Sequence, residues 1–480
     1  MTEFLIALAA LIAGYVIYSR VCARVFGVDP KRKMPAETRY DGVDFMPLPT
    51  WKVFLIQFLN IAGLGPIFGA IMGVKFGPAA FIWIVAGTIF AGAVHDFMSG
   101  MMSICGDGAS LPEIIGRELG MTARQLMNIV SVVLLILVGA VFILTPADLI
   151  AGMTPASLNT TFWICAIFAY YILATLLPID KLIGNFYPVF GLALLFMAVG
   201  VGGYIIFGPV ELNIDMASES SWHVGSQAVF PMMFVSIACG AISGFHATQS
   251  PMMARCLKNE RLARPIFYGA MVAEGIVALI WAAAAIAFTG GYQGLNDYMA
   301  DGGTAGSLVH DISLGWLGTA GGILALFGVI AAPITTGDTA LRSARLITAD
   351  FFKVGQSKLT GRLLVSLPLF ALTFAVMMID YNILWRYFAW VNQTLSVFTM
   401  WAITVWLARH RKAYVISLVP ALFMTIICVS YIFYAPSPEG FGLPLAAATG
   451  IAAAVAVASV AMFIRYLRVS VAERIVKETL

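Results

Sequence analysis

The sequence predicts an all-α polytopic membrane protein with about thirteen transmembrane helices, two of them discontinuous. Three observations support this fold class. The 480 residues are 60% hydrophobic and 11% charged, whereas soluble domains carry about one quarter charged residues. Basic residues cluster in alternate loops between the apolar segments. Glycines interrupt two of those segments, at residues 61–66 and 237–246.

A bilayer core about 30 Å thick requires roughly 20 apolar residues per helix. The first segment of that length spans residues 4–26. It has no basic region before it and no small-residue cleavage site, so we expect a retained helix rather than a signal peptide. The other twelve helices are predicted at 51–74, 78–104, 124–146, 160–178, 186–207, 228–254, 265–289, 316–347, 362–380, 383–408, 413–434 and 442–467.

The charges of the loops orient the chain. Lys and Arg are concentrated in the regions 20–39, 117–124, 255–264, 342–362, 409–412 and 465–477. The alternate loops contain neither residue: 148–159, 208–227, 290–315 and 434–441. Because cytoplasmic loops carry the excess of positive charge, we expect the N-terminus outside, the C-terminus in the cytoplasm and an odd number of crossings.

Ten of the helices form two groups of five with opposite topology. The first group begins on the cytoplasmic side and the second on the outer side, and each begins with its glycine-broken helix. We therefore predict an inverted repeat between two shorter regions. The four parts are 1–50, a leading transmembrane helix and basic cytoplasmic loop; 51–207, the first repeat; 228–408, the second repeat; and 413–480, two additional transmembrane helices and a cytoplasmic tail.

The two breaks have a packing and a functional interpretation. Gly65/Gly69 and Gly240/Gly244 have the spacing with which small residues let helices pack closely. Pro66 removes a backbone donor, and a polar run follows the second break, which favours truly broken helices. Unwound backbone at membrane depth is buried in protein or lines a cavity, and a matched pair of breaks indicates the substrate site of a secondary transporter. The residues predicted to bind substrate are Gly63, Gly65, Pro66, Gly240, Ser243, Gly244, His246, Thr248 and Asn392.

Several stretches around the breaks form recognisable motifs: 61–66, 91–97, 107–111 and 237–247, with looser ones at 336–345 and 388–393. Together they resemble the carbon starvation protein A (CstA) family, over about residues 32–431. Ile56 and Gln57 stand where that family often has two histidines. The resemblance implies a transporter of the bacterial inner membrane for peptides or pyruvate. It also implies the five-plus-five, LeuT-like fold of the amino acid–polyamine–organocation superfamily.

Ionisable groups at membrane depth are costly and are functional candidates by default. The strongest is Asp338, beside Thr335 and Thr336, where oxygen ligands suit Na⁺ or the carboxylate carries a proton. The alternative is an ion pair with Arg342, one helical turn further on. In the inverted-repeat fold this segment faces the first broken helix. The predicted ion-coupling residues are Thr335, Thr336, Asp338, Asp96 and Glu274, of which the first three also form a candidate Na⁺ site.

The other polar candidates each have two interpretations. Asp96 relays protons or caps donors at a helix end, and Glu274 meets a cation or proton or simply faces the bundle interior. His246 titrates near neutral pH, which favours contact with substrate or a proton over a purely structural hydrogen bond. Asn392 lines the cavity or bonds another helix. Arg386 extends toward the membrane surface or attracts an anionic substrate.

Several functional classes are not indicated. The chain contains no GxxxxGK[ST] or HExxH motif, so we expect no ATP-driven motor, no enzymatic activity and no cofactor. The basic runs are interpreted as topology determinants or contacts with anionic lipid, and no nucleic-acid partner is expected. The six cysteines are scattered without a CxxC pair and are interpreted as buried apolar residues.

The predicted function is a secondary active transporter that imports small carboxylate-bearing nutrients, peptides or pyruvate, by alternating access coupled to H⁺ or Na⁺. Helix N-termini at the breaks favour a substrate carboxylate, which both substrate classes possess. The expected partners are a small-molecule substrate and the lipid bilayer, and the oligomeric state stays open. The alternatives are a membrane-embedded nutrient sensor that binds without transporting, an amino acid transporter and a channel.

Overall fold

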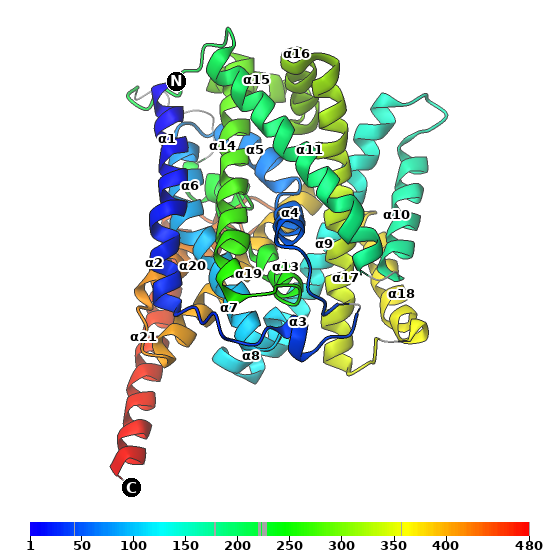
Figure 1. Ribbon diagram of the computed structural model, residues 1–480. Helices are drawn as coiled ribbons and strands as arrows, with labels where there is room; N and C mark the ends of the chain where they lie inside the picture. The colour runs from blue at the N-terminus through cyan, green and yellow to red at the C-terminus, as the bar shows by residue number, and fades with distance from the viewer. Residues whose placement is uncertain (43, 177–178, 219–221, 223–227, 357, 480) are drawn as a thin grey trace.

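The computed structural model describes all residues except 43, 177–178, 219–221, 223–227, 357 and 480. Within this part of the chain every regular element is a helix (Figure 1). The helices are α1 (Thr2–Ala13), α2 (Ser19–Phe26), α3 (Pro35–Thr38), α4 (Thr50–Ile61), α5 (Ala70–Val74), α6 (Ala79–Gly87), α7 (Ala93–Cys105), α8 (Leu111–Leu119), α9 (Met121–Met153), α10 (Thr160–Leu176), α11 (Ile179–Phe207), α12 (Val229–Ser236), α13 (Gly244–Ala254), α14 (Gly269–Thr289), α15 (Tyr292–Ala300), α16 (Ala305–Ala325), α17 (Ala332–Phe352), α18 (Leu359–Val376), α19 (Tyr381–Arg409), α20 (Val415–Tyr434) and α21 (Leu445–Thr479).

The chain is a multi-pass membrane protein. Among the described residues, eight helices are long and apolar enough to cross a bilayer, or ten if each of two bent pairs counts as one span. Large apolar side chains on their flanks are exposed, such as Leu364, Val199 and Phe207, as lipid contact requires. The predicted segments 160–178, 228–254 and 383–408 are not among the ten, so the number thirteen stays a prediction.

The predicted loops contain helices that hydropathy does not reveal. Residues 290–315, expected to form a loop, contain α15 and the beginning of α16, and the short helices α3 and α8 also lie in predicted loops. Helices α3, α8 and α15, with 4, 9 and 9 residues, are too short for a bilayer span. Helix α15 buries only Tyr292 and Leu295, a pattern too weak to recognise in the sequence.

Both predicted helix breaks are present. Helix α4 ends at Ile61, a π-helical turn (Gly65–Gly69) follows, and the axis bends by 51° between Thr50–Ile61 and Gly65–Val74. In the second half, α12 ends at Ser236 and α13 begins at Gly244, with Ser243 in an extended conformation. The backbone is therefore not wound as a continuous α-helix at either place.

The broken helices lie inside the bundle. Helices α4 and α13 appear at its centre in Figure 1, with α1 at one edge and α10 and α18 at the opposite edge. Helix α17 packs against both α9 and α4, and α13 packs against α7, α4 and α19. The two termini lie at opposite ends of the molecule (Figure 1).

The segment between α2 and α4 is tied to the loop after α13. Glu260 is completely buried; its Oε2 accepts a hydrogen bond from Nε of Arg32 at 2.7 Å and its Oε1 one from the backbone N–H of Asp29 at 3.0 Å. Asn259 adds a hydrogen bond from its Nδ2 to the carbonyl of Pro30 at 3.1 Å. We call residues 29–32 the strap, because they join the leading helix to the second half of the chain.

Candidate functional site

The two breaks are in direct contact with each other. A Cβ atom added at Gly65 would lie only 2.2 Å from Cβ of Cys239, and one at Gly69 would lie 3.0 Å from the carbonyl of Ser236. Only glycine allows so close an approach of the two segments. Gly65 is predicted to bind substrate, and Gly65 with Gly69 has the spacing of the packing interpretation; at both glycines the structure places the other broken segment.

Threonine hydroxyls bind carbonyls that the breaks release. Thr336 of α17 donates from Oγ1 to the carbonyl of Leu59 at 3.0 Å, next to the first break. Thr88, which begins a π-helical turn between α6 and α7, donates from Oγ1 to the carbonyl of Gly240 at 3.0 Å in the second break. These two carbonyls therefore have hydrogen-bond partners inside the protein, as backbone groups at membrane depth require.

Asn392 of α19 caps the second half-helix. Its Oδ1 accepts from the backbone N–H of Phe245 at 2.7 Å and from Oγ of Ser243 at 3.0 Å. The first N–H groups of a helix have no partner inside the helix, and the amide oxygen supplies one. Ser243 and Asn392, both predicted to bind substrate, are thus hydrogen-bonded to each other, an arrangement that fits the alternative interpretation of Asn392 as an interhelical bond.

Replacing Asn392 by Ala should loosen this cap. We expect a loss of about 1–2 kcal/mol of stability, the usual effect of removing a helix cap that also satisfies a buried donor. The measurement is the midpoint of thermal unfolding in detergent. Asn213→Ala serves as the control because Asn213 is exposed in the connection before α12. Equal midpoints for the two variants would contradict the capping role.

A chain of four buried ionisable side chains lies beside the second break. Asp96 of α7 contacts Nδ1 of His95 through Oδ1 at 2.8 Å and Nδ1 of His246 through Oδ2 at 2.9 Å. Nε2 of His246, on α13, faces Oε2 of Glu274 on α14 at 3.5 Å. All four side chains have no exposed surface. We call this set, His95–Asp96–His246–Glu274, the relay.

The relay has the chemistry of a proton path. Each imidazole can donate through one ring nitrogen and accept through the other. If both Nδ1–H groups donate to Asp96, Nε2 of His246 is free to exchange a proton with Glu274. At 3.5 Å this contact is at the outer limit of a hydrogen bond, so a small movement of α13 makes or breaks it. The sequence does not show that the four residues of the relay contact one another. Their contacts arise because α7, α13 and α14 pack together.

The other predicted coupling residues lie on α17 against the first break. Thr335, Thr336 and Asp338 are all buried. The hydroxyls of the two threonines donate to backbone carbonyls: Thr335 to Ala332 at 2.7 Å, and Thr336 to Leu59. Their oxygen lone pairs stay available as ligands, so the geometry leaves the Na⁺ interpretation open.

Three buried amides next to these groups were not predicted. Asn60 of α4 accepts through Oδ1 from Oγ1 of Thr339 at 3.3 Å, and Gln249 of α13 donates from Nε2 to Oγ of Ser343 at 3.4 Å. Both ends of the Gln57 amide are buried without a hydrogen-bond partner in the described part of the chain. The signal in the sequence was a polar amide within an apolar segment: Gln57 and Asn60 lie just before the first break, and Gln249 lies after the second.

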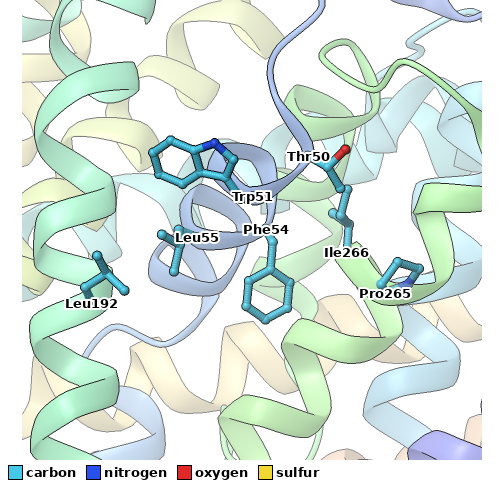
Figure 2. Close-up of a pocket in the computed structure, with 7 residues that line it drawn as sticks. All are labelled: Thr50, Trp51, Phe54, Leu55, Leu192, Pro265 and Ile266. Carbon is cyan, nitrogen blue, oxygen red and sulfur yellow. The ribbon is translucent and has the colours of Figure 1, made fainter.

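A wide apolar groove lies away from the breaks. It has a volume of about 780 Å³ and is lined by residues of α4, α11 and the turn before α14 (Figure 2): Thr50, Trp51, Phe54, Leu55, Leu192, Pro265 and Ile266. Thr50 contributes the single side-chain oxygen. A surface of this kind suits lipid chains better than a carboxylate.

Four of the six cysteines are buried, as the sequence predicts. The exceptions are Cys105, which is partly exposed, and Cys165, which is exposed on α10. The prediction of burial was wrong for these two. Cys165 is exposed because α10 lies at the edge of the bundle (Figure 1), and Cys105 is the last residue of α7. None of the six forms a disulfide.

Comparison with known families gives a match over most of the chain. Residues 1–158 and 147–317 match the model described as "Carbon starvation protein CstA". An uncharacterized membrane protein of Haemophilus influenzae is 42% identical in an alignment of 353 residues that covers 63% of this chain and 95% of that protein.

Relatives with functional names are more distant. The peptide transporter CstA of Escherichia coli is 28% identical over 58% of this chain and 49% of its own, and the pyruvate/proton symporter BtsT of the same organism is 29% identical over 60% and 49%. This chain therefore spans about half the length of these two. The fold is similar to the crystal structure of an Eremococcus coleocola manganese transporter, with a TM-score of 0.50 and 12% identity over 90% of this chain and 99% of that one.

Proposed function

Because this chain belongs to the carbon starvation protein CstA family, we propose that it is a secondary active transporter, driven by protons, that imports small carboxylate-bearing nutrients across the bacterial inner membrane. The names of the relatives support peptides or pyruvate as the substrate class. Their transport function, and that of the similar solved structure, also favours a carrier over an enzyme.

The relay is the observation that supports protons as the coupling ion. Two carboxylates and two imidazoles contact one another in a site without exposure to solvent. Buried groups of this kind inside membrane bundles characteristically form proton paths. The name of the pyruvate/proton symporter among the relatives agrees with this choice. In our proposal, Asp338 assists coupling from the first break.

We propose the five-plus-five inverted repeat, of residues 51–207 and 228–408, as the transport unit. Breaks in the first helix of each group, and a fold similar to a transporter over 90% of this chain, support it. Termini at opposite ends of the molecule (Figure 1) support an odd number of crossings. The loop charges support the N-terminus outside and the C-terminus in the cytoplasm.

The mechanism follows from the contact between the breaks. Gly65 and Cys239 touch, so a substrate reaches the broken segments only after they separate. A proton arriving at Glu274 passes to Nε2 of His246, and the resulting imidazolium is held by Asp96. His246 lies two residues after the start of α13, so its protonation changes the packing of the half-helix that must move.

Uptake by the purified full chain in proteoliposomes tests this proposal. With labelled pyruvate and labelled dipeptide, an inward proton gradient should drive saturable accumulation of at least one, and a sodium gradient alone should not. Accumulation driven by sodium would instead favour the Thr335–Thr336–Asp338 site. Binding without counterflow would indicate the sensor, and flux that does not saturate would indicate the channel; either result rejects the proposed carrier.

A further inference from the structure

A polar cavity lies at the end of the first broken helix, beyond α5. Its volume is about 190 Å³, compared with roughly 30 Å³ per molecule of liquid water, so it admits a short organic acid. Residues of α5, α12, α19, α20 and the loop after α20 enclose it. We call it the vestibule.

Three charged side chains line the vestibule: Lys75, Arg386 and Glu439. Glu439 is already engaged through both oxygens, because Arg386 forms an ion pair with Oε1 and Tyr431 donates its hydroxyl to Oε2 at 3.2 Å. One positive charge of the vestibule thus remains uncompensated, and Lys75 carries it.

Lys75 forms no ion pair with a carboxylate in the described part of the chain. Its nearest aromatic contact is the ring of Phe76, whose centroid lies 5.8 Å from Nζ. Burial first, and then the neighbouring charge of Arg386, lowers the pKa of Lys75. This direction is expected of an ammonium group that is partly removed from water without an anion to stabilise it.

The rest of the vestibule lining combines apolar and small polar groups. Met232, Val235 and Ser236 come from α12, which leads into the second break, and Trp385 comes from α19. An ammonium and a guanidinium beside an apolar wall match a ligand with one carboxylate and a short apolar body.

We propose that the vestibule is a capture subsite for a single small carboxylate, bound by Lys75 with Arg386. This inference rests on the proposed import of carboxylate-bearing nutrients and specifies the group that is recognised first. Lys75 then acts as a specificity residue that concentrates anions next to α12.

A cysteine reporter in the vestibule tests the proposal without requiring transport. Ser236→Cys places a thiol on the wall, in purified full-length protein in detergent, and its modification rates by an anionic sulfonate and a cationic ammonium thiosulfonate reagent are compared. We expect the anionic reagent to react about tenfold faster relative to its rate with a free thiol, since charged clefts raise local counter-ion concentration by this order. Pyruvate and acetate should slow labelling, whereas neutral acetamide should not.

Adding Lys75→Gln should abolish both the anion preference and the protection, and Lys75→Arg should retain both. Lys358→Gln is the control, because Lys358 lies in the connection before α18, outside the vestibule lining. The chain without Ser236→Cys corrects for labelling of Cys105 and Cys165. Unchanged preference and protection in the Lys75→Gln variant would overturn the subsite. A protein that protects in this assay but fails to transport would reject the proposed function alone.

Discussion

Asp96→Asn is expected to abolish proton-driven uptake while leaving substrate exchange intact. Asp96 is the centre of the relay and accepts from one imidazole through each oxygen, at 2.8 and 2.9 Å. An amide has one oxygen acceptor, and its NH₂ group would face the other Nδ1–H, donor against donor. We expect uptake driven by a proton gradient to fall by about 100-fold, the lower range for loss of a positioned proton-transfer group.

Exchange of labelled for unlabelled substrate without a gradient distinguishes coupling from folding. It should continue in the Asp96→Asn variant, because exchange requires no net proton movement. Glu274→Gln, which retains the shape of the other end of the relay, should behave in the same way. Asp301→Asn is the matched control, since Asp301 is exposed after α15. If Asp96→Asn still accumulates substrate in response to a proton gradient, the relay does not couple transport.

Gly244→Ala should strongly destabilise the protein. A Cβ atom at this position would lie 2.3 Å from the backbone oxygen of Asn392 and 2.5 Å from the backbone nitrogen of Ser396. Both are main-chain atoms of α19, so relief requires α13 and α19 to move apart, and the cap on Phe245 is then lost. We expect a cost of about 3 kcal/mol, at the upper end for overpacking.

Thermal unfolding of the purified variant measures this cost, and the yield of monodisperse protein gives a second readout. Gly450→Ala is the control, because no heavy atom lies within 4 Å of a Cβ added there in helix α21. That variant should be neutral or slightly more stable, given the higher helix propensity of alanine. Equal midpoints for Gly244→Ala and the parent protein would contradict the close approach of α13 to α19.

The positions of the long helices and of both breaks were predictable from the sequence. Apolar length determines where a helix can cross a bilayer, and Pro66 with its neighbouring glycines determines where the first one stops. Helix α15 was not predictable, because its sequence is polar and only two of its side chains are buried. Helix α9 extends beyond the predicted range 124–146 at both ends, because apolar length indicates membrane thickness and not helix length. The single helix predicted at 316–347 was wrong: the structure has the end of α16 and most of α17 there, with a bend of 57° between them.

For the candidate site, the sequence shows which polar residues lie in apolar segments, but it does not show which of them contact one another. His246, Asp96 and Glu274 were each noticeable as ionisable groups in apolar segments, but their alignment depends on how α7, α13 and α14 pack. Asn392 had two interpretations, a cavity-lining residue and an interhelical bond, and only the packing of α13 against α19 shows that it caps α13. Lys75 follows an apolar helix and is indistinguishable in sequence from a basic residue at the membrane surface. Its lack of a carboxylate partner in the described part of the chain emerges only from the packing around it.

The strap has a mechanical consequence for alternating access. Glu260 lies in the connection after α13, which ends at Ala254, and binds both Arg32 and the backbone of Asp29. If α13 tilts in the proposed transport cycle, its movement is therefore transmitted to the leading helix through this connection. Either the leading helix moves together with α13, or the strap limits how far α13 can move. In both cases the first helix, which lies outside the two proposed repeats, is coupled to the movement proposed for α13.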